Sequence, residues 1–228
     1  MRIALFSDIH GNTLGLQAVL AHIDAQGGAD VLFALGDILG GGYGTDEIVE
    51  LLLERQVHLI HGNHEELHRD PQTWIETVSE PWRDWARREA DWMQQHLSAA
   101  YCELLAALPL SETIEMTADQ KLFVCHAAPQ DPWARMCAAD APREVVREAF
   151  GEVEAEAVAY GHFHSHHVLW MDGRPLINVA SIGLRQDGLS AYTLLESEDH
   201  TLVVQQFQVP YDAAEEARLN QLYAVPRS

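Results

Sequence analysis

The sequence predicts an α/β fold in which two packed mixed β-sheets are flanked by helices. In the first half, near-continuous apolar runs alternate with helix-like segments, which is typical of strands buried on both faces of a sheet. In the second half, strand-like runs follow one another across short turns, which indicates antiparallel hairpins. A chain of 228 residues with 47% hydrophobic residues can bury a full core, so we expect a single domain over 1–228.

The first half begins with an apolar run and then alternates between the two element types. The expected elements are strands over residues 2–6, 30–35 and 57–60 and helices over residues 13–25 and 46–55. Residues 40–44 follow the second strand and contain four glycines in five positions, which suits a tightly turned loop near a site. Residues 66–110 contain four tryptophans among charged residues, and we interpret them as a helical insertion or cap beside the active face. The tryptophans are Trp74, Trp82, Trp85 and Trp92.

The second half has more strands and fewer helices. We expect strands over residues 121–124, 157–160, 175–179, 191–195 and 202–209 and helices over residues 142–150 and 212–223. Pro142 lies near the first turn of one helix, and Asp212 is a suitable N-cap for the other. Asp172-Gly173 and Glu198-Asp199 are the expected hairpin turns. A parallel sheet followed by such a meander gives two packed sheets with helices outside them.

The charge of the chain limits its partners. Lys and Arg number 14 and Asp and Glu number 35, so the formal net charge is 14 − 35 = −21. Such an acidic surface repels a polyanion and lacks the basic face of a general nucleic-acid-binding protein. We therefore expect no long nucleic acid as a substrate or partner.

The cysteines indicate the compartment. Cys102, Cys125 and Cys137 are an odd number without paired spacing, which favours a reducing environment over a disulfide framework. Cys125 precedes a histidine in a strand, so alternation points its side chain toward the core. No apolar run approaches the roughly 18 residues of a membrane span, so we expect a cytoplasmic protein without a membrane partner.

Five clusters of metal-ligand residues occur just past predicted strands. In chain order they are Asp8-Ile9-His10, Gly36-Asp37, Gly62-Asn63-His64-Glu65, Cys125-His126 and Gly161-His162-Phe163-His164. Open α/β sheets build their sites at the carboxyl ends of strands, so these distant pieces of chain can meet. A single Asp-x-His triplet arises easily by chance, but five blocks in this arrangement indicate a two-metal hydrolytic centre.

These blocks resemble the calcineurin-like metallophosphoesterase superfamily. Its pattern reads D-x-H, G-D-x-x, G-N-H-[ED], a lone His and G-H-x-H, and every block is present here. Residues 36–40 and 178–183 are similar to the compact bacterial phosphodiesterase branch, although Val179 and Ala180 replace the Pro and Gly usual in the second stretch. The resemblance extends over about residues 1–207, but it covers residues 66–110 poorly. It implies a four-layer α/β/β/α sandwich.

The resemblance also implies a ligand set for two divalent ions. Asp8, His10 and His164 would complete the first shell and Asn63, His126 and His162 the second, with Asp37 as the shared bridge. Oxygen and imidazole donors without thiolate fit Mn²⁺, Fe²⁺, Co²⁺, Ni²⁺ or Zn²⁺, and we expect Mn²⁺. A metal-activated hydroxide would attack phosphorus in line.

Two further residues are candidates for proton transfer. His64, beside the ligand Asn63, is the candidate for protonating the leaving alkoxide. Glu65 would orient the His64 imidazole through a hydrogen bond. No other organic cofactor is expected.

Other polar and aromatic residues near the blocks have simpler interpretations. We expect His61, His68, His166 and His167 to lie behind the ligand residues or at the surface and not to bind a metal. The tryptophans of 66–110 are expected to anchor helices in the core, with stacking of an exposed one on a nucleobase as the alternative. Arg135 and Arg185 are expected to be solvated, with contact to a phosphate as the alternative.

The predicted function is a metal-dependent phosphohydrolase, preferably a phosphodiesterase for a small nucleotide or another soluble phosphoester. Hydrolysis of dinucleoside polyphosphates and dephosphorylation of phosphoproteins are the enzymatic alternatives. A scaffold protein that retains its metal site is the non-enzymatic alternative. The residues do not specify the substrate or the oligomeric state.

Overall fold

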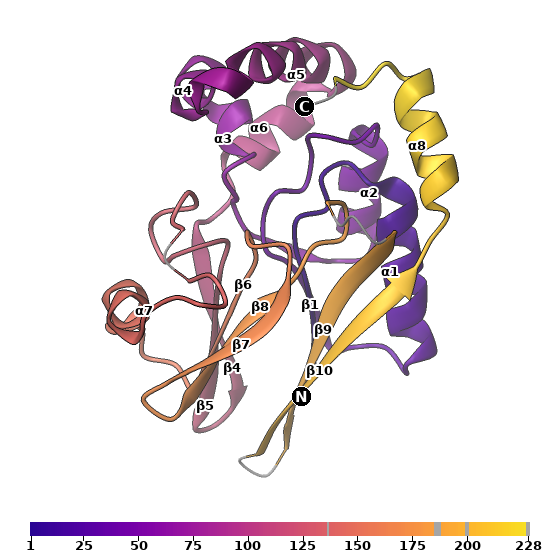
Figure 1. Cartoon of the computed structure of the whole chain (residues 1–228). Helices are drawn as coiled ribbons and strands as arrows, with labels where there is room; N and C mark the ends of the chain where they lie inside the picture. Colours follow the sequence, from indigo (N-terminus) through magenta and orange to yellow (C-terminus); the bar gives the residue numbers. More distant parts are fainter. Residues whose placement is uncertain (136, 185–187, 199–200, 227–228) are drawn as a thin grey trace.

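The computed structural model describes residues 1–135, 137–184, 188–198 and 201–226 and confirms the predicted fold class. Two five-stranded mixed sheets pack face to face, with helices outside both of them (Figure 1). Among the described residues, no helix is long and apolar enough to cross a membrane.

The first sheet contains the predicted strands of the first half. Its order is β10-β9-β1-β2-β3, with β1 parallel to β2 and β2 parallel to β3. Its first-half elements are β1 (Arg2–Phe6), α1 (Thr13–Ala25), β2 (Val31–Ala34), α2 (Asp46–Glu54) and β3 (His58–Leu59). The long hairpin of β9 (Leu189–Glu198) and β10 (Thr201–Pro210) completes it, with β9 antiparallel to β1. The predicted turn at Glu198-Asp199 includes Asp199, which lies outside the described residues.

The second sheet has the order β4-β5-β6-β8-β7 and corrects part of the prediction. Its elements are β4 (Ser111–Thr117), β5 (Gln120–Cys125), α7 (Arg143–Phe150), β6 (Ala157–Tyr160), β7 (His166–Met171) and β8 (Arg174–Val179). The expected meander was wrong here, because β5, β6 and β8 are parallel. The long connection through α7 allows a crossover that a short hairpin turn would forbid. The predicted turn at Asp172-Gly173 is confirmed and joins β7 to β8.

No apolar pattern predicted β4 and β7, and their positions explain this. Both are edge strands, and most of their side chains are only partly buried or exposed. A strand with one open edge and a partly solvated face does not require the continuous apolar run of a central strand. Their sequences, SETIEMT and HHVLWM, accordingly mix polar and apolar residues.

Alternation along the central strands builds the layers. Ile3 and Leu5 of β1 belong to an apolar cluster between the two sheets, together with Leu122 and Val124 of β5. Ala4 and Phe6 belong to the cluster that β1 shares with α1 and α2 on the outer face. A strand with period 2 thus supplies two layers, and burial of both faces makes its register strongly specified.

The outer face of the second sheet packs against α7. Phe150 of α7 and Tyr160 of β6 lie in one buried cluster. Cys125 and Cys137 belong to the same cluster, and the core position predicted for Cys125 is confirmed by its full burial. All three cysteines are free thiols.

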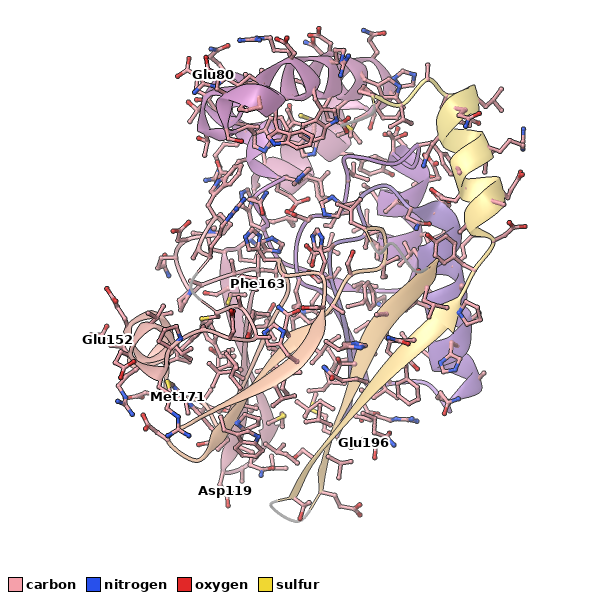
Figure 2. All side chains as sticks on the ribbon, viewed as in Figure 1. Glu80, Asp119, Glu152, Phe163, Met171 and Glu196 are labelled. Atoms are coloured by element: carbon pink, nitrogen blue, oxygen red, sulfur yellow. The ribbon has the colours of Figure 1, made fainter. Side chains whose placement is uncertain are left out.

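The segment 66–110 is helical and lies at one end of both sheets (Figure 1). It contains α3 (Glu66–Arg69), α4 (Pro71–Thr77), the 3-10 helix η1 (Glu80–Trp82), α5 (Arg83–His96) and α6 (Ala99–Ala106). Glu80 lies in this helical layer, whereas Asp119 and Glu196 lie at the far end of the sheets (Figure 2). The helices therefore cover the end at which the parallel strands finish.

The last helix, α8 (Ala213–Leu222), ties the C-terminal segment to α1 and to the helical layer. The Asp212 side chain accepts a hydrogen bond from the Glu215 backbone N–H at 2.9 Å, which confirms the predicted N-cap. Beyond α8, the Tyr223 carbonyl accepts a bond from Trp92 Nε1 at 3.0 Å. The chain after β10 therefore reaches the end of the molecule that holds α5.

One buried carboxyl group on α8 gives stability an unusual pH dependence. Glu216 is 5% exposed, and its Oε2 accepts a bond from the Leu14 backbone N–H at 3.3 Å. Burial, partly offset by that bond and reinforced by Glu47, raises the pKa of Glu216 from 4.5 to about 7. The folded state therefore binds more protons than the unfolded state between these two values, so stability falls as pH rises through them.

Replacing Glu216 with Gln should remove this pH dependence while keeping an acceptor for Leu14. Relative to the variant, the wild type should lose about 1–3 kcal/mol of unfolding free energy between pH 5 and pH 8. Urea unfolding at the two pH values measures the difference. Glu152→Gln, at an exposed position, is the control and should behave as the wild type does. Equal pH dependence of wild type and Glu216→Gln would contradict the assignment.

Candidate metal centre

The candidate ligands lie at strand ends where the backbone turns sharply. Asp8, His10, Asp37, His162 and His164 have φ values of 53°, 49°, 51°, 69° and 54°. For residues other than glycine this left-handed conformation is strained, at a cost on the order of 1 kcal/mol or more each. The strain is concentrated at the carboxyl ends of β1, β2 and β6, where it turns these side chains toward one region.

Close packing of two of these loops requires glycine. A Cβ on Gly36, whose φ is 87°, would lie 2.6 Å from the Gly62 Cα and 2.7 Å from His126 Nδ1. A Cβ on Gly62 would lie 2.4 Å from the Asp37 backbone nitrogen. Any side chain at these positions would push the Asp37 loop away from the Asn63 loop.

The first donor group comprises Asp8, His10 and His164, together with Asp37 Oδ2. Asp8 Oδ1 lies 3.0 Å from His164 Nε2 and 3.9 Å from His10 Nε2. Asp37 Oδ2 lies 3.6 Å from His10 Nε2. One ligand atom from each of Asp8, His10 and His164 falls within a span of 4.8 Å, which suits a shared cation.

The second donor group comprises Asn63, His126 and His162, together with Asp37 Oδ1. Asn63 Oδ1 lies 3.1 Å from His126 Nε2 and 2.9 Å from His162 Nδ1. Asp37 Oδ1 lies 3.5 Å from His126 Nε2. The two oxygens of Asp37 thus face different donor groups, which is the geometry of a bridging carboxylate.

Backbone carbonyls fix two of the imidazoles. His10 Nδ1 lies 3.1 Å from the Gly40 carbonyl oxygen, and His126 Nδ1 lies 2.7 Å from the Leu35 carbonyl oxygen. A nitrogen beside a carbonyl oxygen carries the proton, so in the neutral form of each ring Nε2 has the lone pair that a metal needs. His10 Nε2 is buried and has no hydrogen-bond partner among the described residues. An orphaned buried nitrogen fits a site that receives a cation.

Burial and neighbouring groups set the charges of the site. Burial opposes ionisation of Asp37, but the imidazoles of His126 and His64 hold its pKa well below the ordinary value. Burial lowers the pKa of His10 to about 3 and that of His162 to about 4. Burial also disfavours a charged His126, yet Asp37 raises the pKa of His126 to about 10. Positive charge is therefore favoured beside Asp37, where the cations would lie.

His64 lies beside both donor groups. Its backbone N–H donates to Asp37 Oδ1 at 2.8 Å, and its ring centroid is 4.6 Å from that of His10. Burial lowers the pKa of His64. Its Nδ1 is buried and has no hydrogen-bond partner among the described residues. The ring edge is thus close to any group bound at the two donor groups.

Glu65 has different partners from those predicted. Its Oε2 accepts bonds from the backbone N–H groups of Gly62 and Asp37 at 2.7 Å and 2.8 Å, and its Oε1 accepts from Ile38 at 2.9 Å. The predicted hydrogen bond to the His64 imidazole was wrong, because both oxygens are already taken by backbone donors. Glu65 instead fastens the Asp37 loop to the Asn63 loop.

The remaining histidines near the motifs lie outside the donor groups. His61 Nε2 lies 3.0 Å from Glu66, and His167 Nε2 lies 2.9 Å from the Tyr160 hydroxyl. Burial lowers the pKa of His68 to about 4. None of these, nor His166, belongs to a cluster of three potential ligands in the described part of the chain.

Residues 178–183 form hydrogen bonds to the loop after β1 and to the loop after β6. The Asn178 side chain donates to the Gly161 carbonyl, and Ser181 Oγ donates to the Asp8 carbonyl at 2.8 Å. The Ile182 and Gly183 backbone N–H groups donate to Ser7 and Asp8. This stretch therefore fixes the β1 loop and the β6 loop relative to each other.

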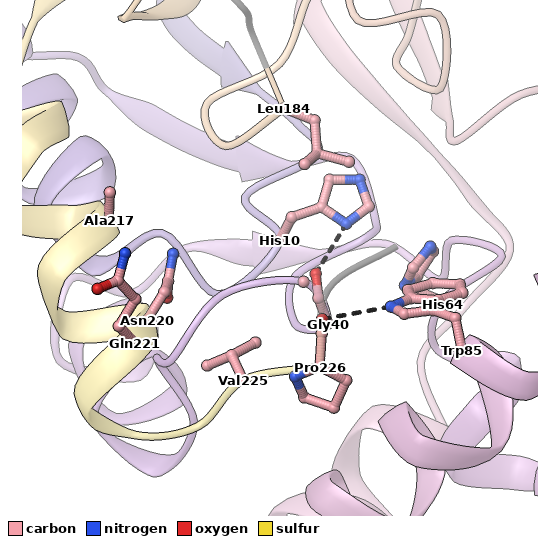
Figure 3. A pocket seen from close by; sticks show the side chains of 11 residues that line it. His10, Gly40, His64, Trp85, Leu184, Ala217, Asn220, Gln221, Val225 and Pro226 are labelled. Atoms are coloured by element: carbon pink, nitrogen blue, oxygen red, sulfur yellow. Dashed lines mark hydrogen bonds between the residues drawn. The ribbon is translucent and has the colours of Figure 1, made fainter.

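Three neighbouring cavities meet at His64. The metal cavity, about 360 Å³, is lined by His10, Asp37, Asn63, His64, Arg135, His162, Phe163, His164 and Leu184. The amide cavity, about 660 Å³, is lined by His10, Gly40, Gly41, His64, Trp85, Leu184, Ala217, Asn220, Gln221, Val225 and Pro226 (Figure 3). The tryptophan cavity, about 540 Å³, is lined by Asn63, His64, Trp74, Thr77, Val78, Ser79, Trp82, Trp85, Trp133 and Arg135.

Sequence reasoning missed several of these lining residues. Asn220 and Gln221 come from α8, and Figure 3 shows them across the amide cavity from His64. Trp133 lies outside every predicted element. No local pattern marks these residues, because only packing of distant segments brings them to the centre. Arg185 lies outside the described residues.

The chain is similar to known proteins over most of its length. A sequence model of the calcineurin-like phosphoesterase superfamily domain matches residues 1–200. The uncharacterized protein MJ0912 of Methanocaldococcus jannaschii is 26% identical over 231 residues, covering 92% of this chain and 88% of that protein. The crystal structure of the hypothetical protein PH1004 from Pyrococcus horikoshii OT3 is similar with a TM-score of 0.85 at 20% identity, covering 99% of this chain and 94% of that chain.

A metallophosphoesterase from Sphaerobacter thermophilus is similar with a TM-score of 0.75 at 25% identity, covering 100% of this chain and 95% of that chain. The resemblance expected from the five motif blocks is thereby confirmed along most of the sequence. The chain belongs to the calcineurin-like phosphoesterase superfamily.

Proposed function

We propose that this phosphoesterase-family protein is a dinuclear metal-dependent phosphodiesterase for a small nucleotide or another soluble phosphoester. The observation that carries the proposal is the sharing of Asp37 between two donor groups. Its two oxygens lie 3.6 Å from His10 Nε2 and 3.5 Å from His126 Nε2. A carboxylate placed between two such groups would hold two cations close enough to act on one phosphate.

The proposed ligands divide as the two donor groups do. Asp8, His10, His164 and Asp37 would hold the first ion, and Asn63, His126, His162 and Asp37 the second. Imidazole nitrogens with carboxylate and amide oxygens suit Mn²⁺, Fe²⁺, Co²⁺, Ni²⁺ or Zn²⁺, and we propose Mn²⁺. When bound, the ions supply positive charge for the phosphoryl oxygens and lower the pKa of water to generate a nucleophile.

The protein's own groups would position the ester and its leaving group. His64 lines the metal cavity and both adjoining cavities, so it would lie near the leaving oxygen whichever side cavity holds the leaving group. We assign it the transfer of a proton to that oxygen. Glu65 would contribute by keeping the Asp37 loop in place through its three backbone hydrogen bonds.

The preference for diesters is supported by the two side cavities. A phosphodiester carries an organic group on each of two oxygens, whereas a monoester carries one. The amide cavity of about 660 Å³ and the tryptophan cavity of about 540 Å³ adjoin the metal cavity and offer space for both. A dinucleoside polyphosphate fits the same description and remains the nearest alternative substrate.

The segment 66–110 would act as a cap on a single domain. Trp85 of α5 lines both side cavities, and its Nε1 donates to the Pro226 carbonyl at 3.4 Å. Residues of α5 and of the C-terminal segment form walls beside the metal cavity. Such walls would restrict access of a substrate to the proposed metal ions, which favours small esters over phosphoproteins. Three free thiols favour the reducing cytoplasm as the compartment.

Metal content and hydrolytic activity distinguish the proposed enzyme from the scaffold alternative. A scaffold needs neither a full set of ligands nor a proton-transfer residue beside it. Elemental analysis for metal, combined with hydrolysis of bis(p-nitrophenyl) phosphate with added Mn²⁺, distinguishes the two classes. Bound metal without hydrolysis would favour the scaffold.

Replacing Asp37 with Asn should impair metal binding and activity together. The substitution removes the charge that screens two mutually repelling cations, so we expect reduced metal occupancy and a loss of bis(p-nitrophenyl) phosphate hydrolysis of roughly 100-fold or more. Metal analysis and kcat/KM check this. Asp172→Asn, which changes an exposed carboxylate paired with Arg147, is the matched control. Near-normal turnover at low metal would show that Asp37 is not the bridge.

Replacing His64 with Ala should affect poor leaving groups most. A p-nitrophenolate leaves without a proton, whereas the alkoxide released from a dinucleotide requires one. The loss in kcat for the dinucleotide should therefore be roughly 10²–10⁴-fold, and much smaller for the p-nitrophenyl ester, with both metals retained. His58→Ala, on an exposed residue, is the control. Equal losses on both substrates would assign His64 to metal support or phosphate binding.

A further inference from the structure

The tryptophan cavity has features that phosphate hydrolysis itself does not require. Its walls include four indoles, contributed by α4, η1, α5 and the loop after β5. The residues are Trp74, Trp82, Trp85 and Trp133. The cavity begins at Asn63 and His64, so it opens directly onto the second donor group and the proposed proton donor.

The indoles differ in burial, and the difference indicates their roles. Trp74 is 2% exposed, and its ring centroid lies 5.9 Å from that of Trp85 and 5.6 Å from that of His64. Trp74 and Trp85 therefore form one aromatic cluster with His64. Trp82 is 48% exposed, so its indole is not part of the packed core. The expectation of core anchors holds for Trp74 but not for Trp82.

Arg135 connects this cavity to the metal cavity, because it lines both. It makes no ion pair with any other described residue, although the chain carries a net charge of −21. An exposed guanidinium that lines both the metal cavity and an aromatic cavity is well suited to a phosphate oxygen, because its planar fork matches phosphate geometry.

We propose that the tryptophan cavity is a subsite for the base of a nucleoside phosphate, with Arg135 contacting the phosphate that links this nucleoside to the metal centre. The proposal rests on the phosphodiesterase function and specifies its substrate class as nucleotide esters. Indole faces stack on any nucleobase, so the subsite would select for an aromatic ring and not for one particular base. Sugar phosphates and aliphatic esters would leave the cavity unfilled.

Calorimetric titration of the Mn²⁺-loaded protein with AMP and with ribose 5-phosphate tests the subsite. The two probes share the sugar and the phosphate and differ by the base. The wild type should bind AMP at least roughly 10-fold more tightly, since stacking on aromatic side chains commonly gives a factor of this size or more. Equal affinities would overturn the proposal.

Two variants assign the binding to these residues. Trp82→Ala should weaken AMP by roughly 5- to 100-fold and leave ribose 5-phosphate unchanged. Arg135→Ala should weaken both probes by a similar factor, because it contacts their common phosphate. Trp170→Ala, which removes a 62% exposed indole on β7, and Arg143→Ala, at an exposed position, are the matched controls and should bind both probes as the wild type does. Unchanged AMP binding by Trp82→Ala would contradict the subsite.

The subsite and the proposed function fail in different experiments. Absence of metal-dependent hydrolysis of bis(p-nitrophenyl) phosphate by the wild type would refute the hydrolase function, regardless of the affinity for AMP. Hydrolysis together with equal binding of AMP and ribose 5-phosphate would refute only the subsite. Circular dichroism and the melting temperature of Trp82→Ala exclude unfolding as the cause of lost binding, and the exposure of Trp82 makes a folded variant the expected result.

Discussion

The buried carboxylate of Asp37 is the constraint on which the rest of the centre depends. It follows β2 in the first sheet, yet it lies 3.5 Å from His126, which follows β5 in the second sheet. The carboxyl ends of β2 and β5 must therefore lie side by side. The apolar cluster between the two sheets holds the sheets in this arrangement. Packing of Ile3 and Leu5 with Leu122 and Val124 would thus also be a condition for the proposed chemistry.

Maintaining Asp37 in place requires support from three directions. Glu65 bonds the backbone of Asp37 and Ile38, the His64 N–H bonds the Asp37 side chain, and Gly62 leaves room for the loop. Burial and the charge of Asp37 raise the pKa of Glu65 to about 7, so its charge is itself coupled to that of the centre. Strain in the left-handed strand ends is tolerated because these bonds fix the loops.

The walls of the two side cavities come from the helical segment 66–110 and from the C-terminal helix. The helical segment contributes Trp74, Trp82 and Trp85, and α8 contributes Asn220, whose side chain also accepts a bond from the Tyr43 backbone N–H at 2.8 Å. The glycine-rich residues 40–44 thus contact both α8, through Tyr43, and the proposed ligand His10, through the Gly40 carbonyl. The strand ends of the two sheets carry the proposed ligands, and the peripheral helices line the adjoining cavities.

Much of the fold was predictable because its signals are local. A run such as residues 2–6 or 157–160 is buried on both sides, so its apolar pattern alone marks a strand, and both ranges match the observed strands. Edge strands such as β4 carry no such pattern. The choice of parallel pairing for β5, β6 and β8 depends on a crossover whose direction no short segment encodes.

The sequence by itself determined which residue types stand at the strand ends and in which order, since each motif block is a contiguous stretch of chain. Tertiary structure decided which of them face one another. Glu65 was expected to bond its neighbour His64, but it bonds Asp37 and Ile38, more than 25 positions away along the chain. Asn220 and Gln221 reach the cavity beside His64 only because α8 packs there. Such partners are set by the packing of whole elements, and neither spacing nor composition records that packing.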